Sequence, residues 1–227
     1  AIGAGRNRKA GDWNYATQSY RQPGSTAKPI FDYGPGFEYN DFSTYTLFND
    51  EPWTYTNGPE IGNWDGGYQG LITLRQALSV SRNIPALKAF QQVDKKKIAS
   101  FVSGLGIDIA YSTKDENYQK YSNGGDNLLN EAYSIGGMSR GVTPLDMAEA
   151  YASFANGGYH IETHAVTKIE YRSTGKTVDF TYDKEKVMSD STAYLMNNVL
   201  QYAVEYAFNG GARVYGSTVA AKTGTSN

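Results

Sequence analysis

Apolar residues recur at helical spacing on both sides of a polar tripeptide, Ser81-Arg82-Asn83. Before it, Thr73 and Gln76 have the spacing of a capping box, and apolar positions follow them at helical intervals. After it, the pattern resumes at Ile84-Pro85, where a proline suits the first turn of a helix. We therefore predict two helices, with the tripeptide at the break between them.

Four further helices are predicted from start and stop signals, namely capping side chains, first-turn prolines and terminal glycines. They are a short segment that begins at Ser25, a lysine-rich stretch at about 94–104, the stretch between Thr143 and Asn156, and a long amphipathic stretch from Ser189 or Asp190 to about 207. The charged run at 95–97 is expected to be a solvated face.

Strands are expected near the C-terminal end of the sequence. Residues 165–171 and 177–182 predict a hairpin around Ser173-Thr174-Gly175, and residues 217–225 predict one more strand. Residues 33–68 are rich in Gly, Asn, Asp and Tyr and indicate long ordered loops. Because helices surround strands without a βαβ rhythm, the predicted fold class is α+β.

Composition excludes several functions. The chain has 227 residues and a net charge of -2, so nothing electrostatic indicates a nucleic acid or an anionic membrane as partner. It has no cysteine, which rules out disulfides, thiol catalysis and cysteine-ligated metals. No stretch approaches ~18 consecutive apolar residues and no signal peptide opens the chain, so any membrane anchor is expected outside it.

Three short motifs follow one another as S-x-x-K, S-x-N and K-T-G. They are Ser25-Thr26-Ala27-Lys28, Ser81-Arg82-Asn83 and Lys222-Thr223-Gly224. The ordered set is typical of penicillin-binding proteins and class A β-lactamases. S-x-x-K alone is a weak signal, since Ser173-Thr174-Gly175-Lys176 repeats it within the predicted hairpin turn, where we expect a surface loop.

Lys28 is the candidate base for Ser25, because residues three apart on a helix share a face. A lysine accepts a proton only when neutral, and lowering its pKa from about 10.4 to about 7 requires burial and a second cation nearby. Lys222 is the candidate cation. Ser81 is a candidate proton relay to a leaving amine, and the amide of Asn83 would hold Lys28 or a substrate carbonyl.

Lys222-Thr223-Gly224-Thr225 is the candidate substrate-binding strand. An extended peptide can pair along such an edge, and Gly224 would let the two backbones approach closely. Lys222 and the threonine hydroxyls suit a terminal carboxylate. The N–H groups of Ser25 and Thr225 are candidate donors of an oxyanion hole.

The residues around the motifs resemble class A penicillin-binding proteins, the bifunctional peptidoglycan synthases. The resemblance covers most of residues 15–227 and is carried by residues 21–29, 74–78 with 81–86, 136–137 with 141–148, and 151–158. It implies a mainly antiparallel sheet sandwiched by helices, as in serine β-lactamases. Residues 1–227 would then be the central part of a transpeptidase domain, truncated at both ends.

The resemblance also implies an activity, D,D-transpeptidation. Ser25 would attack the D-Ala–D-Ala amide of a peptidoglycan stem peptide and pass the acyl group to an amine on a neighbouring strand, and β-lactam antibiotics would acylate the same serine. No metal or organic cofactor is implied. The family's membrane anchor and glycosyltransferase domain have no counterpart here. The strands that precede the nucleophile helix and follow K-T-G in the family are also mostly missing, so companion fragments of the same polypeptide are expected to complete the sheet. The expected location is the extracellular face of the bacterial cytoplasmic membrane.

Other functions remain open from the residues alone. A serine β-lactamase would need a water-activating base, and we find none: Asp126 stands where class A β-lactamases carry a glutamate, but in a different context, so a surface carboxylate is expected. A carboxypeptidase and a penicillin-binding sensor or interaction domain would use the same nucleophile. His160 and His164 have a zinc-like spacing but are predicted in a surface loop. The tryptophans and tyrosines of residues 13–68 are expected to fix the long loop by packing rather than to line a groove.

Overall fold

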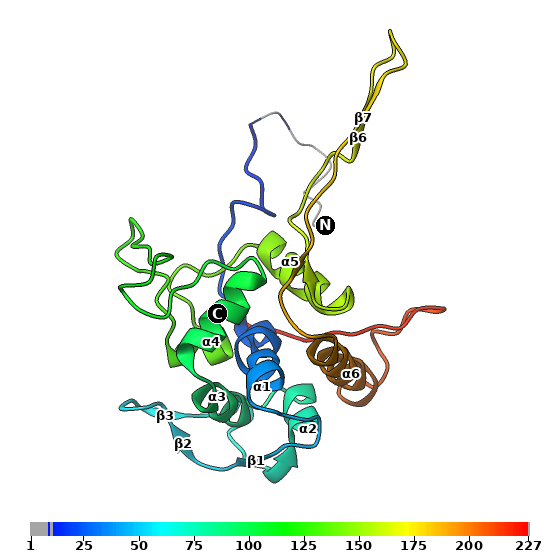
Figure 1. Cartoon of the computed structure of the whole chain (residues 1–227). Coiled ribbons are helices and arrows are strands. Elements are labelled where there is room, and N and C mark those ends of the chain that lie inside the picture. The colour runs from blue at the N-terminus through cyan, green and yellow to red at the C-terminus, as the bar shows by residue number, and fades with distance from the viewer. Residues whose placement is uncertain (1–8, 10, 227) are drawn as a thin grey trace.

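The helical segment that carries Ser25 runs through the centre of the molecule (Figure 1). The computed structural model describes residues 9 and 11–226. The central segment passes from a 3-10 turn, η1 (Gly24–Ala27), through a π-helical stretch, η2 (Pro29–Tyr33), into α1 (Gly34–Tyr39). In the π-helical stretch the Gly34 N–H donates to the Pro29 carbonyl, an i→i+5 bond.

Five other α-helices confirm the helices predicted from capping and periodicity. They are α2 (Leu74–Ser79), α3 (Asn83–Gln92), α4 (Lys95–Gly104), α5 (Pro144–Ala155) and α6 (Asp190–Tyr206). The Thr73 hydroxyl accepts from the Gln76 N–H, and the Gln76 side chain accepts from the Thr73 N–H, as a capping box requires. Thr143 and Asp146 form a second capping box, at the start of α5.

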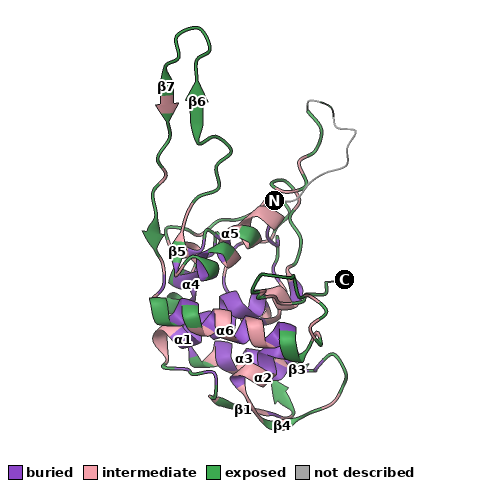
Figure 2. Cartoon of the chain, turned by 90° about the vertical axis from the view of Figure 1, so that its right-hand side faces the viewer, coloured by how far each residue is buried: buried purple, intermediate pink, exposed green. Residues whose placement is uncertain are grey.

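The apolar core surrounds this central segment, and the buried positions concentrate in the helices (Figure 2). Ile30, Phe31 and Tyr33 are fully buried, and Phe31 stacks on Tyr133 of η3 (Glu131–Ile135) with ring centroids 5.7 Å apart. One prediction is wrong here: loops are expected over residues 33–68, but this range contains α1 and also the short strands β1 (Leu47–Asp50), β2 (Trp53–Thr54) and β3 (Glu60–Ile61). The buried Phe37 keeps α1 helical, which local sequence did not indicate.

The strands form four two-stranded antiparallel sheets in the part of the chain that the structure describes. The pairs are β1 (Leu47–Asp50) with β4 (Gly70–Thr73), β2 (Trp53–Thr54) with β3 (Glu60–Ile61), β5 (Tyr159–His160) with β8 (Glu185–Lys186), and β6 (Lys168–Glu170) with β7 (Thr177–Asp179). The α+β class is confirmed, and the sheets described here are short.

The predicted hairpin is confirmed and forms an arm that projects from the body (Figures 1 and 2). The second S-x-x-K copy, residues 173–176, lies exposed at its tip. The strand predicted at 217–225 is wrong for the described residues, where the segment has only a bridge from Ser217 to Val214 and a bond from the Ala221 N–H to the Leu200 carbonyl. A strand is defined by its paired neighbour, and none pairs with this segment here.

None of the helices formed by residues 9 and 11–226 has both the length and the apolar composition needed to cross a membrane.

Candidate active site

The three predicted motifs meet at one hollow of about 730 Å³. It is lined by Ser25, Trp64, Ser79, Val80, Ser81, Asn83, Ile135, Tyr206, Ala207, Phe208, Thr223, Gly224 and Thr225. Ser25 comes from η1, Ser81 from the break between α2 and α3, Asn83 from the start of α3, and the threonines from the C-terminal segment. The folded chain therefore brings together residues that are far apart in the sequence.

Lys28 lies directly behind this hollow and is fully buried. Its Nζ is 2.8 Å from the Ser81 carbonyl oxygen, 2.8 Å from Asn83 Oδ1 and 3.2 Å from Ser81 Oγ. Asn83 is held in turn, because its Nδ2 donates to the Gly62 carbonyl at 2.8 Å. The predicted contact between Asn83 and Lys28 is thus present.

Ser25 Oγ has no hydrogen-bond partner among the described residues, so the predicted contact between Lys28 Nζ and the Ser25 hydroxyl is not formed in this structure. Catalytic hydrogen bonds are often long before substrate binds and tighten only in the complex. The half-buried Ser25 side chain lines the hollow, which leaves its hydroxyl open to a ligand.

Burial, followed by the charge of Lys222, lowers the pKa of Lys28 to about 7. Asp32 acts in the opposite direction, and Arg82 adds a smaller lowering effect. Burial also lowers the pKa of Lys222, to about 8. Near neutral pH a large share of Lys28 is therefore uncharged, which is the state that can accept a proton.

Ser81 lies between the two lysines. Lys222 Nζ donates to Ser81 Oγ at 2.8 Å, and the same oxygen is 3.2 Å from Lys28 Nζ. The Ser81 backbone has φ 61°, a left-handed conformation that is uncommon for residues other than glycine. Ser81 presents both its carbonyl and its hydroxyl oxygen to Lys28 in this conformation.

Arg82 does not line the hollow and instead contacts the long loop. Its side chain is buried and its Nε donates to Asp50 at 2.7 Å, while Nη1 donates to Asp65 at 2.7 Å and Nη2 to the Gly67 carbonyl. Asn63 continues the link: its Nδ2 donates to Asp50, and its Oδ1 accepts from the Asn83 N–H at 2.8 Å. Arg82 therefore fixes the long loop to the S-x-N turn.

Sequence reasoning missed Asp50 and Asn63 as supports of the site. Both are buried, and each is the partner of a residue about 20 to 30 positions away. No local pattern marks them, because an acidic residue or an amide in a polar loop is ordinary. The one usable signal is Arg82 itself, because an arginine buried in a turn needs a counter-charge such as Asp50.

Two glycines hold the nucleophile turn close to its neighbours. A Cβ on Gly136, which ends η3 with φ 85°, would lie 2.3 Å from the Gly24 carbonyl oxygen. A Cβ on Gly24, with φ 56°, would lie 2.3 Å from the carbonyl oxygen of Thr225. Tyr151 anchors the same turn, since its hydroxyl donates to the Thr26 carbonyl at 2.9 Å.

The other candidates lie outside the hollow, but the surface-loop prediction is wrong for His160, which is half-buried in β5. His160 Nε2 lies 3.6 Å from Glu149 Oε2, and the His164 ring stacks on that of Tyr182. Asp126 accepts from the Tyr118 hydroxyl and the Leu128 N–H and is not among the residues that line the hollow. Over the described part of the chain, no cluster of three or more His, Asp or Glu side chains could hold a metal ion.

The aromatic residues of the long loop divide between two roles. Trp53 donates to the Gln91 side chain at 2.8 Å and lies under Lys88, so it fixes the loop as expected. Trp64 instead lines the hollow and is exposed, while its Nε1 donates to the Val80 carbonyl at 3.2 Å. The prediction that these aromatic residues only pack the loop is therefore incomplete, because Trp64 also presents an exposed surface to the hollow.

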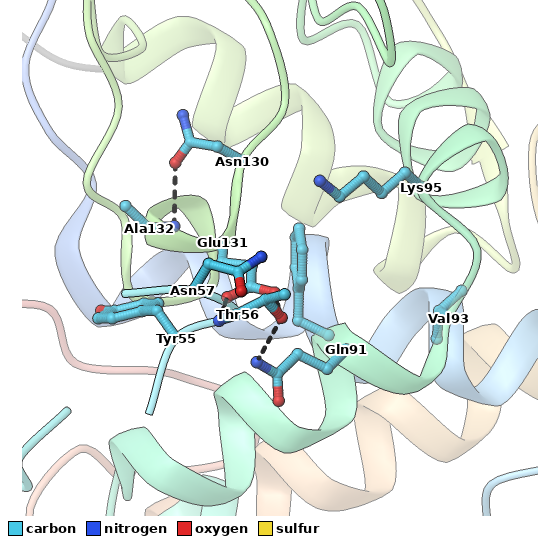
Figure 3. A pocket seen from close by; sticks show the side chains of 10 residues that line it. Tyr55, Thr56, Asn57, Gln91, Val93, Lys95, Asn130, Glu131 and Ala132 are labelled. Carbon is cyan, nitrogen blue, oxygen red and sulfur yellow. Dashed lines mark hydrogen bonds between the residues drawn. The ribbon is translucent and has the colours of Figure 1, made fainter. Parts of the chain in front are cut away.

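Figure 3 shows a second hollow of about 720 Å³, bounded by the turn after β2, the end of α3 and the start of η3. Glu131 closes one side by accepting from the Thr56 N–H at 2.7 Å and from its hydroxyl at 2.5 Å. Tyr55 and Ile135 pack on one small apolar cluster that separates this hollow from the first. None of the three motifs contributes a residue to it, so the chemistry belongs to the first hollow.

Comparison with known proteins identifies the class to which this fold and site belong. The family described as "Penicillin binding protein transpeptidase domain" matches residues 4–227. The chain is 47% identical over its whole length to penicillin-binding protein 1A/1B of Bacillus subtilis, and 37% identical over 94% of its length to penicillin-binding protein 1A of Streptococcus pneumoniae. It spans 23% and 28% of those two proteins.

Solved structures agree on the fold. Penicillin-binding protein 1A of Haemophilus influenzae superposes with a TM-score of 0.77 at 24% identity, over 95% of this chain and 36% of that one. An imipenem acyl-enzyme complex of penicillin-binding protein A from M. tuberculosis gives 0.77 at 20% identity, over 95% and 51%. The chain belongs to the family of penicillin-binding protein transpeptidase domains.

Proposed function

We propose that this chain carries the D,D-transpeptidase site of a peptidoglycan synthase, with Ser25 as the nucleophile that forms an acyl-enzyme. The observation that carries the proposal is the meeting of two lysines with lowered pKa values at Ser81 Oγ, beside a free Ser25 hydroxyl. Lys28 and Lys222 are 53 and 141 residues from Ser81 in sequence, so a coincidental meeting is a poor explanation.

The first half-reaction would acylate Ser25. Neutral Lys28 takes the Ser25 proton, the oxygen attacks the carbonyl carbon of the penultimate D-Ala, and the N–H groups of Ser25 and Thr225 stabilise the oxyanion. The Ser25 N–H belongs to the first turn of η1, where backbone donors have no acceptor within the helix. The C–N bond then breaks, and the proton passes through Ser81 to the leaving amine of D-Ala.

The second half-reaction would return the enzyme to its starting state. An amine of a neighbouring stem peptide attacks the ester carbonyl, its proton passes to the basic groups, and Ser25 leaves with its proton restored. Lys222 and Thr223 would bind the substrate carboxylate. The 3.4 Å distance between Lys222 Nζ and Thr223 Oγ1 supports this role, since both groups could reach one carboxylate. A β-lactam would follow the first half-reaction only, since its opened ring stays attached.

A hydrolase interpretation has less support. The residues that line the hollow include no Asp or Glu within the described chain, so no carboxylate is placed to activate a water molecule against the ester. The acyl-enzyme would therefore persist until an amine arrives. This observation favours a transpeptidase over a β-lactamase.

Intact mass spectrometry after incubation with benzylpenicillin tests the proposal, using the natural polypeptide that contains this chain. We expect one drug adduct on the wild type and on Ser173→Ala, and none on Ser25→Ala. Rapid drug hydrolysis without an adduct would replace the transpeptidase with a β-lactamase. If neither an adduct nor drug hydrolysis is observed, the assignment of Ser25 as the nucleophile is overturned.

A second measurement separates the acyl acceptors. Incubation with a stem peptide ending in D-Ala-D-Ala and an amine acceptor should release D-Ala and form a cross-linked product, both dependent on Ser25. D-Ala release without cross-linking would indicate a carboxypeptidase. A β-lactam adduct with no peptide turnover would indicate a penicillin-binding sensor or interaction domain.

A further inference from the structure

Asp32 is a buried carboxyl group that takes no part in the chemical steps proposed above. Its side chain is completely inaccessible, and neither of its oxygens has a hydrogen-bond partner in the part of the chain that the structure describes. No ion pair involving it forms within 4.0 Å among those residues. Because a buried polar group without a partner is costly, such groups in native proteins call for an explanation.

The position of Asp32 points to Lys28. Ser25, Lys28 and Asp32 stand at positions i, i+3 and i+7 of one continuous helical segment, a spacing that puts all three on one face. Asp32 lies within the π-helical stretch η2, and π-helical turns recur at functional sites. The nucleophile, its candidate base and a carboxyl group therefore follow one another along the same side of the helix.

The charges around Lys28 leave a role for an anion. Burial, Lys222 and Arg82 all lower the pKa of Lys28, and Asp32 alone among the contributing groups raises it. When Lys28 takes the proton of Ser25, an ammonium forms inside the protein beside two other cations. A carboxylate nearby would stabilise that ammonium, as an opposite charge within the protein interior does.

We propose that Asp32 is a positioning residue for the acylation step, whose buried carboxylate balances the charge that Lys28 acquires from Ser25. This inference rests on the proposed transpeptidase function. The step balances: the Ser25 O–H bond breaks, an N–H bond forms on Lys28, and Asp32 keeps its own protonation state throughout. Asp32 acts only through Lys28 and touches neither the substrate nor the reacting carbonyl.

The charges of Lys28 and Asp32 each shift the pKa of the other group. Burial raises the pKa of the Asp32 carboxyl well above its ordinary range, and the charge of Lys28 opposes that rise. The other groups that act on the pair are Lys222 and Arg82 beside Lys28, and Tyr33 and Tyr55 beside Asp32. Arg82 is itself ion-paired with Asp50. The acid limb of the acylation rate therefore reports the pKa of Lys28 as shifted by the charge of Asp32.

The test is the pH dependence of the second-order acylation rate constant with benzylpenicillin, measured on the natural polypeptide. In Asp32→Asn the anion is removed at nearly constant shape, so the pKa of Lys28 should fall. We expect the acid limb to move to lower pH by about one unit, and the plateau rate to fall because the amine is less basic. Asp32→Leu should displace the acid limb by the same amount. Asp32→Glu keeps the anion and should therefore give the wild-type acid limb.

Controls separate this role from a structural one. Tyr33→Phe alters a neighbouring buried group that also lacks a partner, and should leave the acid limb in place. An acid limb that stays unchanged in folded Asp32→Asn and Asp32→Leu overturns the inference, even if both variants react more slowly. Loss of the folded state in both variants would assign the carboxyl group to folding and also overturn it. Absence of acylation in the wild type would instead remove the proposed function itself.

Discussion

The hydroxyl of Ser81 is shared by two lysine amines, and the protonation of those amines decides what the site can do. Lys28 reaches Ser81 at both its carbonyl and its hydroxyl oxygen, while Lys222 donates to the hydroxyl alone. A neutral Lys28 has a lone pair for the Ser25 proton, whereas an ammonium has none. Two predictions concern this balance.

The acylation rate of the wild type should fall as the pH drops below about 7. Burial and the nearby Lys222 lower the pKa of Lys28 to about 7, so the amine is protonated below that pH and loses its basicity. The second-order rate constant for benzylpenicillin, measured from acid to mildly alkaline pH, checks this. A rate that is independent of pH on both sides of neutrality would show that Lys28 is not the base.

Replacing Lys28 by methionine should slow acylation by about 10²–10⁴-fold, the usual contribution of a general base. The methionine keeps a similar length, so the loss should appear in the rate constant. Rates measured by quenched-flow mass spectrometry provide the check. Lys176→Met, in the exposed second S-x-x-K copy, is the matched control and should react like the wild type.

At the scale of secondary-structure elements, short segments are held at the site by close backbone contacts and one buried ion pair. Gly136 ends η3 in a left-handed conformation directly against Gly24, at the start of η1. Arg82 and Asp50 join the S-x-N turn to β1. The glycine contact leaves no space for an added Cβ. The ion pair is buried, so removing one partner would leave an unpaired charge.

Gly136→Ala should displace the nucleophile turn and reduce acylation more than Gly124→Ala does. Both glycines have left-handed φ values, 85° and 87°, so the conformational cost is matched. A Cβ at Gly136 meets the Gly24 backbone at 2.3 Å, whereas a Cβ at Gly124 meets nothing within 4 Å. Acylation rates and Tm values of both variants check this. Equal effects would mean that the contact with Gly24 does not position the turn.

Arg82→Met should reduce the free energy of unfolding by about 3–5 kcal/mol, because it leaves the buried Asp50 carboxylate without its counter-charge. The double variant with Asp50→Leu should recover much of that loss, since the unpaired charge is then gone. Urea denaturation of the single and double variants measures both effects. Arg213→Met, which removes an exposed ion pair to Glu205, is the control and should change the midpoint little. A loss that the double variant does not recover would contradict this explanation.

At the scale of the whole molecule, the three motifs meet at one hollow while the sheets around it are small. The residues of all three motifs surround one hollow, but the C-terminal segment that carries Lys222 has no strand pair in the described chain. The chain spans about a quarter of the relatives it matches, 23% and 28% in the two examples given. We propose that companion segments of the same polypeptide pair with residues 217–225, and that the polypeptide lies at the outer face of the cytoplasmic membrane.

Supplying the flanking segments of the natural polypeptide in trans should raise the Tm of this chain and increase its acylation rate. Pairing would cover the edge offered by residues 217–225 and hold Lys222 and Thr225 in place. Thermal unfolding and penicillin adduct formation, with and without the segments, provide the measurements. If neither quantity changes, the C-terminal segment needs no partner strand, and the proposed completion of the sheet is wrong.

Local sequence was sufficient for most helices of this protein. Capping boxes at Thr73 and Thr143 and a capping serine at Ser189 fixed helix starts, because each satisfies backbone donors of the first turn from within a few residues. Motif spacing also indicated the site, since S-x-x-K, S-x-N and K-T-G each describe a short segment. Their relation to one another was an inference from resemblance until the fold placed them together.

The tertiary structure decided which of these signals matter. Two copies of S-x-x-K are equivalent in sequence, but one borders the hollow and the other lies at the tip of an exposed arm. The burial of Lys28, the counter-charge of Arg82 and the isolation of Asp32 depend on residues from distant segments. Sequence alone determined the local helices and the chemical groups. Desolvation and charge pairing are properties of packed neighbours, so only the folded chain could set the basicity of Lys28.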